Sequence, residues 1–230
     1  MNSNQKTVKI VGILFLVQML AAVLSYSVIL EPILYKANFL NELSANSTMV
    51  IIAMLLDLIC GASVFAIAIL LFPILKHFNE RVALWYVGQR LTEFMGFMVS
   101  GLLLLTLLKI GHDITNKSGL EPSHTEAIAT YLRNARGNLQ NIALLIYCLG
   151  AWSFYGLLFY ARLLPRFISV WGLLGVTLLF IEIMANVFGT SAGGMMIMMP
   201  LGLNEIFLGI WLIAKGFRPS TLKQVSADIS

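Results

Sequence analysis

Five ionisable side chains fall inside stretches of the sequence that are otherwise apolar enough for lipid. They are Asp57, Arg90, Glu93, Glu182 and Glu205. On insertion scales, a charged side chain at the centre of a membrane helix costs roughly 2.5 to 3.5 kcal/mol. Five such groups facing lipid would cost roughly 12 to 17 kcal/mol on the same scale, which is comparable to the stability of a whole domain. We therefore expect these side chains to face the protein interior, to pair with one another or to take up protons.

The most central of these residues belong to two apolar stretches. Glu93 and Glu205 fall near the middle of their stretches, and Arg90 precedes Glu93 by three residues, so one helix face carries both. Asn204 stands directly before Glu205, and Pro200 lies early in the same stretch, where it frees a backbone carbonyl near the acid. We predict that these polar side chains form a site inside the bundle that binds a small ligand or a proton.

The remaining acids are predicted to extend this site toward the outer half of the membrane. Asp57 and Glu182 lie nearer the outer ends of their stretches, and Glu182 shares a helix face with Asn186 at i, i+4. One arginine cannot neutralise four acids. At least one acid is therefore expected to be protonated or to meet a cationic ligand.

The composition is that of a membrane protein. Of 230 residues, 59% are hydrophobic and only 11% are charged, and the mean hydropathy is +0.86. In soluble domains about a quarter of all residues are charged. The formal net charge is +4, but the basic residues stand in short clusters at the ends of apolar stretches, where they set topology. We expect no nucleic-acid partner.

Six stretches are long enough to cross a bilayer, which takes about 20 apolar residues. They are predicted at 8–30, 49–74, 82–109, 137–161, 168–190 and 195–216. We expect one all-α transmembrane domain with six helices over residues 1–217, followed by a polar tail over 218–230. Glycines lie one turn after three of the buried acids and should let neighbouring helices approach closely: Gly61, Gly96 and Gly209.

Lysine and arginine are distributed unequally between the two sides of the predicted bundle. Nine lie on the side of the termini: Lys6, Lys9, Lys76, Arg81, Arg162, Arg166, Lys215, Arg218 and Lys223. Five lie on the other side: Lys36, Lys109, Lys117, Arg133 and Arg136. Cytoplasmic connections carry the excess of basic residues, so we expect both termini in the cytoplasm and a multi-pass protein of the cell membrane.

The longest connection, 110–136, contains a helix signal. Pro122 is followed by Ser123 and, three residues later, Glu126, a spacing typical of a capping box. Arg133 and Arg136 would then stand near the helix end, where the dipole favours positive charge. We predict a short extracytoplasmic helix that precedes the fourth span.

Several chemistries lack the residues that they need. All histidines lie in connections, so a haem within the bundle has no ligand, and no lysine lies mid-membrane for a Schiff base. Cys60 and Cys148 both fall inside apolar stretches, where packing is the expected role. Two metal alternatives stay open, an outer site of His112, Asp113 and His124 and a copper site of thioethers within 195–199. We expect neither, and no cofactor.

Three segments carry a resemblance to a known family. They are "RLTE", "RLLPRFISVWGLLG" and "PLGLNEIFLGIWLIAKGF". The chain resembles a bacterial family of six-helix integral membrane proteins that is catalogued as a domain of unknown function, DUF4386. The resemblance implies six helices, a bacterial plasma membrane and Arg90, Glu93 and Glu205 as matched polar positions. It implies no substrate and no catalytic residue, and Asn204 stands where similar proteins are expected to have an apolar residue.

Transport or ligand binding within the bundle is the function that these features favour. The acids recur in a three-plus-three pattern that resembles the inverted repeats of small transporters, although the two halves share negligible identity. Two other classes stay open: a membrane enzyme that uses the carboxyls as acid and base on a lipid, and a noncatalytic sensor or assembly partner. The lipid bilayer is the expected partner, and a homo-oligomer or a membrane partner protein stays open.

Overall fold

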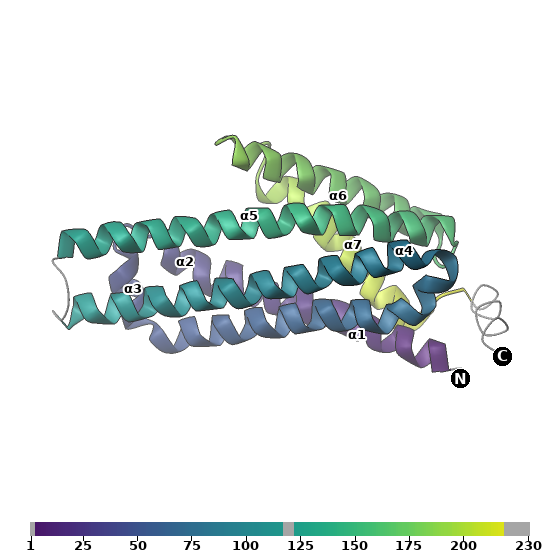
Figure 1. Ribbon diagram of the computed structural model, residues 1–230, viewed down its shortest axis with the longest axis horizontal. Coiled ribbons are helices and arrows are strands. Elements are labelled where there is room, and N and C mark those ends of the chain that lie inside the picture. The colour runs from purple at the N-terminus through teal and green to yellow at the C-terminus, as the bar shows by residue number, and fades with distance from the viewer. Residues whose placement is uncertain (1–2, 117–121, 219–230) are drawn as a thin grey trace.

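The computed structural model describes residues 3–116 and 122–218, and this part of the chain contains helices and no strand (Figure 1). The all-α prediction is confirmed. The predicted polar tail lies outside the described residues except for Arg218. The helices are α1 (Ser3–Ala22), η1 (Val23–Leu30), α2 (Glu31–Leu34), α3 (Phe39–Ala45), α4 (Ser47–Thr115), α5 (Pro122–Tyr160), α6 (Arg166–Val187) and α7 (Met195–Ala214).

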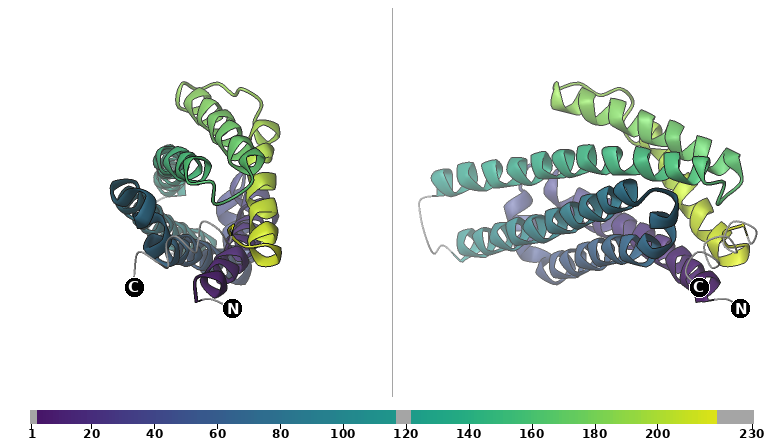
Figure 2. Two further views of the ribbon diagram at one scale, coloured as in Figure 1. Left: turned by 90° about the vertical axis from the view of Figure 1, so that its right-hand side faces the viewer. Right: turned by 45° about the vertical axis from the view of Figure 1, so that its right-hand side comes forward.

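Five helical segments are long and apolar enough to cross a membrane: Asn4–Leu34, Ser47–Thr115, Ser123–Tyr160, Arg166–Val187 and Met195–Ala214. The second and third predicted spans both belong to α4. This helix folds back at Asn79, whose backbone is extended (φ −161°, ψ 104°), into a first arm over 47–78 and a second arm over 80–115. Each of the six predicted stretches is therefore helical over most of its length, and two of them are arms of one hairpin (Figure 2).

The fold-back of α4 has a local cause in the sequence "KHFNER". The Oδ1 atom of Asn79 accepts a hydrogen bond from the backbone N–H of Val82 at 3.1 Å. Asn79 thus caps the second arm in the way that asparagine caps helix N-termini in general. Because the cap replaces a loop, the two arms pair directly.

The helices form a ring in which each element packs on its sequence neighbour and α7 closes against α1 (Figure 2). Both described ends of the chain lie at the same end of the bundle, called here the terminal end, where Gln5 Nε2 donates to the carbonyl of Phe217 at 3.1 Å. The opposite end, called the distal end, holds α2 and α3 (Figure 1). The side of the membrane on which the termini lie stays a prediction.

The predicted helix start at Pro122 is confirmed, but the prediction that this helix is short and ends before the fourth span is wrong. Residues 122–136 are helical, but they continue without a break into the span as part of α5. The 39 residues of α5 extend over about 58 Å at 1.5 Å per residue, nearly twice the roughly 30 Å of hydrocarbon in a bilayer. Arg133 and Arg136 therefore stand inside a long helix, away from both of its own ends.

The first span contains an irregularity that the sequence does not announce. Between α1 and α2 the chain forms the π-helix η1 over Val23–Leu30. π-Helical turns are rare and occur frequently at functional sites. The turn carries Ser25, which is buried inside the bundle.

Three apolar clusters follow one another along the bundle. The largest, the terminal core, joins residues of α1, α4, α5, α6 and α7, among them Phe15, Leu71 and Leu208. The distal core joins residues of η1, α2 and α3 with residues from the distal parts of α4 and α5. Between them lies a small middle layer formed by Ala21, Cys60 and Val64. The polar side chains of interest occupy the two levels that separate these clusters.

Close helix contacts occur at two of the three predicted glycines. A Cβ atom on Gly209 would lie 3.0 Å from the carbonyl oxygen of Gly12, and one on Gly12 would lie 2.7 Å from that of Gly209, so α1 and α7 meet backbone to backbone. A Cβ atom on Gly61 would lie 2.8 Å from the ring of Phe94. At Gly96 the corresponding distance, 3.4 Å to the Cβ atom of Ala143, is an ordinary contact.

Because α1 and α7 are in backbone contact at Gly12, a methyl group added there is predicted to destabilise the protein. Gly12→Ala should lower the free energy of unfolding in detergent by about 1 to 3 kcal/mol, because the Cβ atom meets a backbone carbonyl that cannot move aside. Gly88→Ala is the matched control, since nothing lies within 4 Å of its Cβ position. Equal stability of the two variants would contradict the prediction.

Candidate functional site

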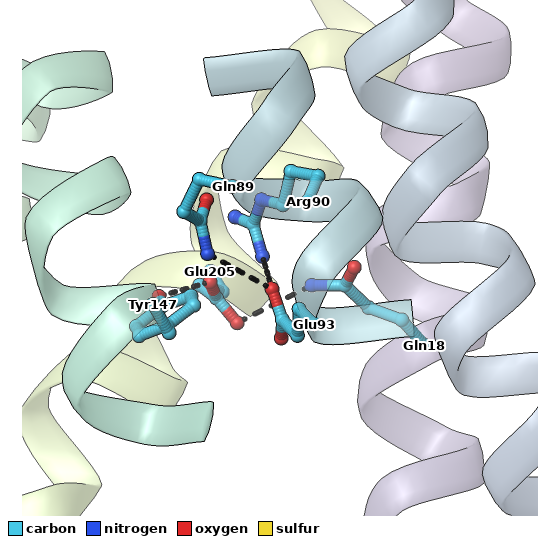
Figure 3. A network of polar contacts seen from close by, with 6 residues as sticks. All are labelled: Gln18, Gln89, Arg90, Glu93, Tyr147 and Glu205. Atoms are coloured by element: carbon cyan, nitrogen blue, oxygen red, sulfur yellow. Dashed lines mark hydrogen bonds and ion pairs between the residues drawn. The ribbon is translucent and has the colours of Figure 1, made fainter. Parts of the chain in front are cut away.

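A buried polar cluster, called here the central cluster, lies between the terminal core and the middle layer (Figure 3). Four helices supply it: Gln18 of α1, Gln89, Arg90 and Glu93 of α4, Tyr147 of α5 and Glu205 of α7. Arg90 is 2% exposed, Glu205 is 7% exposed and the side chain of Glu93 is 13% exposed. The structure thus brings together three of the residues predicted from the sequence.

Arg90 is contacted by side chains of its own helix and of α5. Its Nη1 atom lies 2.8 Å from Oε2 of Glu93, the ion pair that the i, i+3 spacing predicts. The guanidinium also lies over two aromatic rings, with 5.1 Å to the centroid of Tyr86 and 4.9 Å to that of Tyr147. Such contacts stabilise a cation by about 2 kcal/mol or more when water is excluded. Tyr86 is one helical turn from Arg90, so the second arm of α4 provides most of the binding site for this charge.

Glu205 has neutral partners. Its Oε1 atom accepts a hydrogen bond from the hydroxyl of Tyr147 at 2.7 Å, and its Oε2 atom accepts one from Nε2 of Gln18 at 3.4 Å (Figure 3). Glu93 accepts the direct bond from Arg90. The cluster therefore combines two carboxyl groups with one guanidinium, and it carries one negative charge in excess when both acids are ionised.

Asn204 does not join Glu205. Its Nδ2 atom donates to the backbone carbonyl of Ile168 in α6 at 3.0 Å. Successive residues of a helix point about 100° apart, because one turn takes 3.6 residues, so neighbours in sequence face different helices. Asn204 connects α7 to α6, while Glu205 faces α1 and α5.

A second polar group, called here the distal cluster, surrounds Asp57. Its Oδ2 atom lies 3.4 Å from Nη2 of Arg136, and its Oδ1 atom lies 2.5 Å from the hydroxyl of Ser25, which is also 3.0 Å from the carbonyl of Ala53. Arg136 is 3% exposed. One acid here meets one arginine, so the charges of this cluster balance.

Arg136 is a site residue that the sequence analysis missed. It was assigned to an outer connection because residues 122–136 were expected to end as a separate helix. A signal was present, since Tyr147 follows Arg136 by eleven residues, three turns of a continuous helix. A helical count continued through this segment would have placed both side chains on one face.

Glu182 and Asn186 lie apart from both clusters. Glu182 is buried, and its carboxylate accepts hydrogen bonds from the hydroxyl of Ser191 and the backbone N–H of Ala192, each at 2.9 Å. It thereby holds the turn between α6 and α7. Asn186 is exposed. The shared face that the spacing predicts does not form a common site.

The middle layer separates the two polar clusters. Ala21 lies about one turn from Gln18 on one side and from Ser25 on the other, so successive turns of the first span enter the central cluster, the middle layer and the distal cluster. Cys60 and Val64 of α4 complete the layer. Along α1 and α4, the two clusters are thus separated by two apolar side chains and a thiol.

Among residues 3–116 and 122–218, no three histidine, cysteine, aspartate or glutamate side chains are grouped so as to hold a metal ion. His112, one member of the alternative outer metal site, forms a hydrogen bond of 3.2 Å with the hydroxyl of Ser44. Cys60 and Cys148 are buried free thiols.

The buried pair of Asp57 and Arg136 should dominate the stability of the distal cluster. We expect Asp57→Asn or Arg136→Gln alone to lower the free energy of unfolding by about 3 kcal/mol, because each leaves a buried charge without its partner. The double variant should lose less than the sum of the two, because neither charge remains.

The control for this prediction is Lys36→Gln. Lys36 forms a 2.9 Å ion pair with Glu42 but is 51% exposed, so its removal should cost less than about 1 kcal/mol. Chemical unfolding of the four variants and the wild type measures these differences. Strict additivity of Asp57→Asn and Arg136→Gln would show that the two residues do not interact.

Comparison with known proteins gives one finding on family membership. Neither curated proteins nor solved structures include a match. A family model does match, over residues 10–216, and its description is "Domain of unknown function (DUF4386)". The match includes both polar clusters and the turn held by Glu182, and it confirms the resemblance seen in the sequence. The chain therefore belongs to the family defined by the domain of unknown function DUF4386.

Proposed function

We propose that this multi-pass membrane protein binds a proton at its central cluster as part of proton-linked transport of a small solute. The active unit is a single transmembrane domain over residues 1–217, in a bacterial cell membrane with both termini in the cytoplasm. The orientation rests on the basic residues at the terminal end. The function rests on the charges of the central cluster.

The observation that carries the proposal is the ratio of two carboxyl groups to one guanidinium. An arginine side chain does not release its proton in proteins, so the variable charge of the cluster lies on Glu93 and Glu205. A buried charge left without a partner costs about 3 to 5 kcal/mol. Binding one proton removes the excess negative charge. The charges of the central cluster are therefore balanced when one proton is bound. After the proton is released, the cluster favours binding of a second cation or a conformational change.

Glu205 is the acid best placed to exchange the proton. Glu93 is bonded directly to Arg90, which stabilises its ionised form, whereas Glu205 has only neutral hydrogen-bond partners. The hydroxyl of Tyr147 and the amide of Gln18 can remain bonded to either form of a carboxyl group, because a hydroxyl both donates and accepts and an amide has both kinds of atom. We assign Glu205 as the proton-binding residue and Glu93 as the counter-charge of Arg90.

A structural role for the same residues is the second candidate. Arg90 is fixed by Glu93 and lies between Tyr86 and Tyr147, so the ion pair contributes to the packing of α4 against α5. In that case, removal of a charge lowers stability and there is no flux to lose. The two functions predict different outcomes of one experiment.

Proton flux into dye-loaded proteoliposomes, driven by an imposed pH gradient and membrane potential, tests the proposal. We expect Glu205→Gln to reduce the flux to the background of empty liposomes, because a glutamine cannot take up a proton. Glu93→Gln should also abolish it, because Arg90 would then stabilise ionised Glu205 permanently. Glu80→Gln, which removes an exposed carboxylate at the start of the second arm, should leave the flux unchanged.

Either of two results would overturn the proposal. Wild-type flux at the level of empty liposomes would exclude proton-linked transport, and a loss of thermal stability in Glu93→Gln and Glu205→Gln would then support the structural role. Undiminished flux in a correctly folded Glu205→Gln variant would show that the proton passes elsewhere.

A further inference from the structure

Three buried polar side chains have unpaired atoms between α5, α6 and α7. They are the hydroxyl of Tyr155, the hydroxyl of Ser169 and the Oδ1 atom of Asn204, and none of these atoms forms a hydrogen bond with another described residue. Each residue is at most 1% exposed. None belongs to the central cluster or the distal cluster.

The three side chains converge on the first turns of α6. The ring of Tyr155 lies against Gly172, where an added Cβ atom would overlap it. Ser169 stands three residues before Gly172, so both share one face of α6. Asn204 reaches the same region, since its Nδ2 atom donates to the carbonyl of Ile168. Side chains from three helices thus lie at residues 168–172 of α6, and each carries an unpaired hydrogen-bonding atom.

This place lies beside Glu205, on its terminal side. Asn204 adjoins Glu205 in α7 and is bonded to the carbonyl of Ile168, so the first turns of α6 lie near Glu205. Tyr155 follows Tyr147, the partner of Glu205, by eight residues, about 12 Å along α5 in the direction of the terminal end. Ser169 lies one turn from the start of α6, at that same end.

Unpaired polar atoms in a protein interior are uncommon, because each loses its hydrogen bonds to solvent on burial. Internal water molecules usually satisfy such atoms, and a buried water typically makes about three hydrogen bonds. Two hydroxyl groups and an amide oxygen provide both donors and acceptors for such a water. The set therefore fits one or two water molecules better than it fits a metal ion or an apolar ligand.

We propose that Tyr155, Ser169 and Asn204 form a buried water site that transfers protons between Glu205 and the terminal end of the bundle. Its role in proton transfer rests on the proposed function, whereas the water site itself does not. On the other side of the central cluster, the middle layer of Ala21, Cys60 and Val64 offers no hydrogen-bonding side chain except a thiol. Glu205 consequently exchanges its proton with the terminal end alone in this conformation.

Radiolytic hydroxyl labelling tests the water site directly, because a side chain beside a bound water is oxidised even when it is buried. We expect Tyr155 to be labelled several-fold faster than Phe154, a buried neighbour that packs on Tyr86 within the terminal core. Labelling of Tyr155 at the rate of Phe154 would overturn the water site, whatever the proton flux.

The transfer role is tested by proton flux in Tyr155→Phe and Ser169→Ala. Each removes one hydroxyl and preserves the rest of the side chain, so folding should be retained, and thermal stability checks this. Loss of one hydrogen bond to the transferring water should slow the flux by up to about tenfold. Ser153→Ala, which removes a hydroxyl of α5 bonded to the carbonyl of Leu149, should leave the flux at the wild-type rate.

The outcomes separate the two proposals. Wild-type flux that is unchanged in both Tyr155→Phe and Ser169→Ala overturns the transfer role while the function of Glu205 stands. Rapid labelling of Tyr155 without any wild-type flux overturns the proposed function and supports the water site alone.

Discussion

A guanidinium group that cannot lose its proton lies at the centre of this bundle, and the arrangement of the surrounding helices follows from that charge. Arg90 is almost fully removed from lipid and solvent. Its stabilisation takes an acid on its own helix and two aromatic rings, one from each of two helices. Tyr147, one of these rings, also directs its hydroxyl to Glu205. The position of α7 relative to α4 is therefore linked to Arg90 through a single tyrosine.

The sequence specifies the class, the apolar stretches and the core of the central cluster, because each depends on local spacing. The ion pair of Arg90 and Glu93 is an example, since three residues along any helix bring two side chains together. The errors arise where a contact depends on which way a helix points or where it ends. Asn204 faces α6 because it precedes Glu205 by one residue and therefore points in a different direction from the helix axis. Glu182 bonds to the turn between α6 and α7, and only the folded chain defines the path of this turn.

The π-helix and Arg136 illustrate the same limit in another form. Nothing in "VLSYSVIL" distinguishes η1 from an ordinary helical turn, yet this turn presents Ser25 to Asp57. The sequence places Arg136 near the end of a short extracytoplasmic helix, because the capping box at Ser123 and Glu126 predicts a helix start there. Its burial depends on the first arm of α4, which supplies Asp57 and lies far from it in the chain. Long-range partners of this kind have no local signature.

The two polar clusters have similar residue types but differ in charge balance, and this difference separates their roles. In the distal cluster one acid meets one arginine, so the most stable state has both groups ionised. A change in the protonation of either group would not stabilise this cluster. In the central cluster two acids face one arginine, so the charges balance only when one acid is protonated or a second cation is bound. A protein that must bind and release a proton needs such an imbalance, whereas one that must only hold its helices together is better served by a balanced pair. Arg136 is already neutralised by Asp57, so the distal cluster has no net positive charge to offer the central cluster.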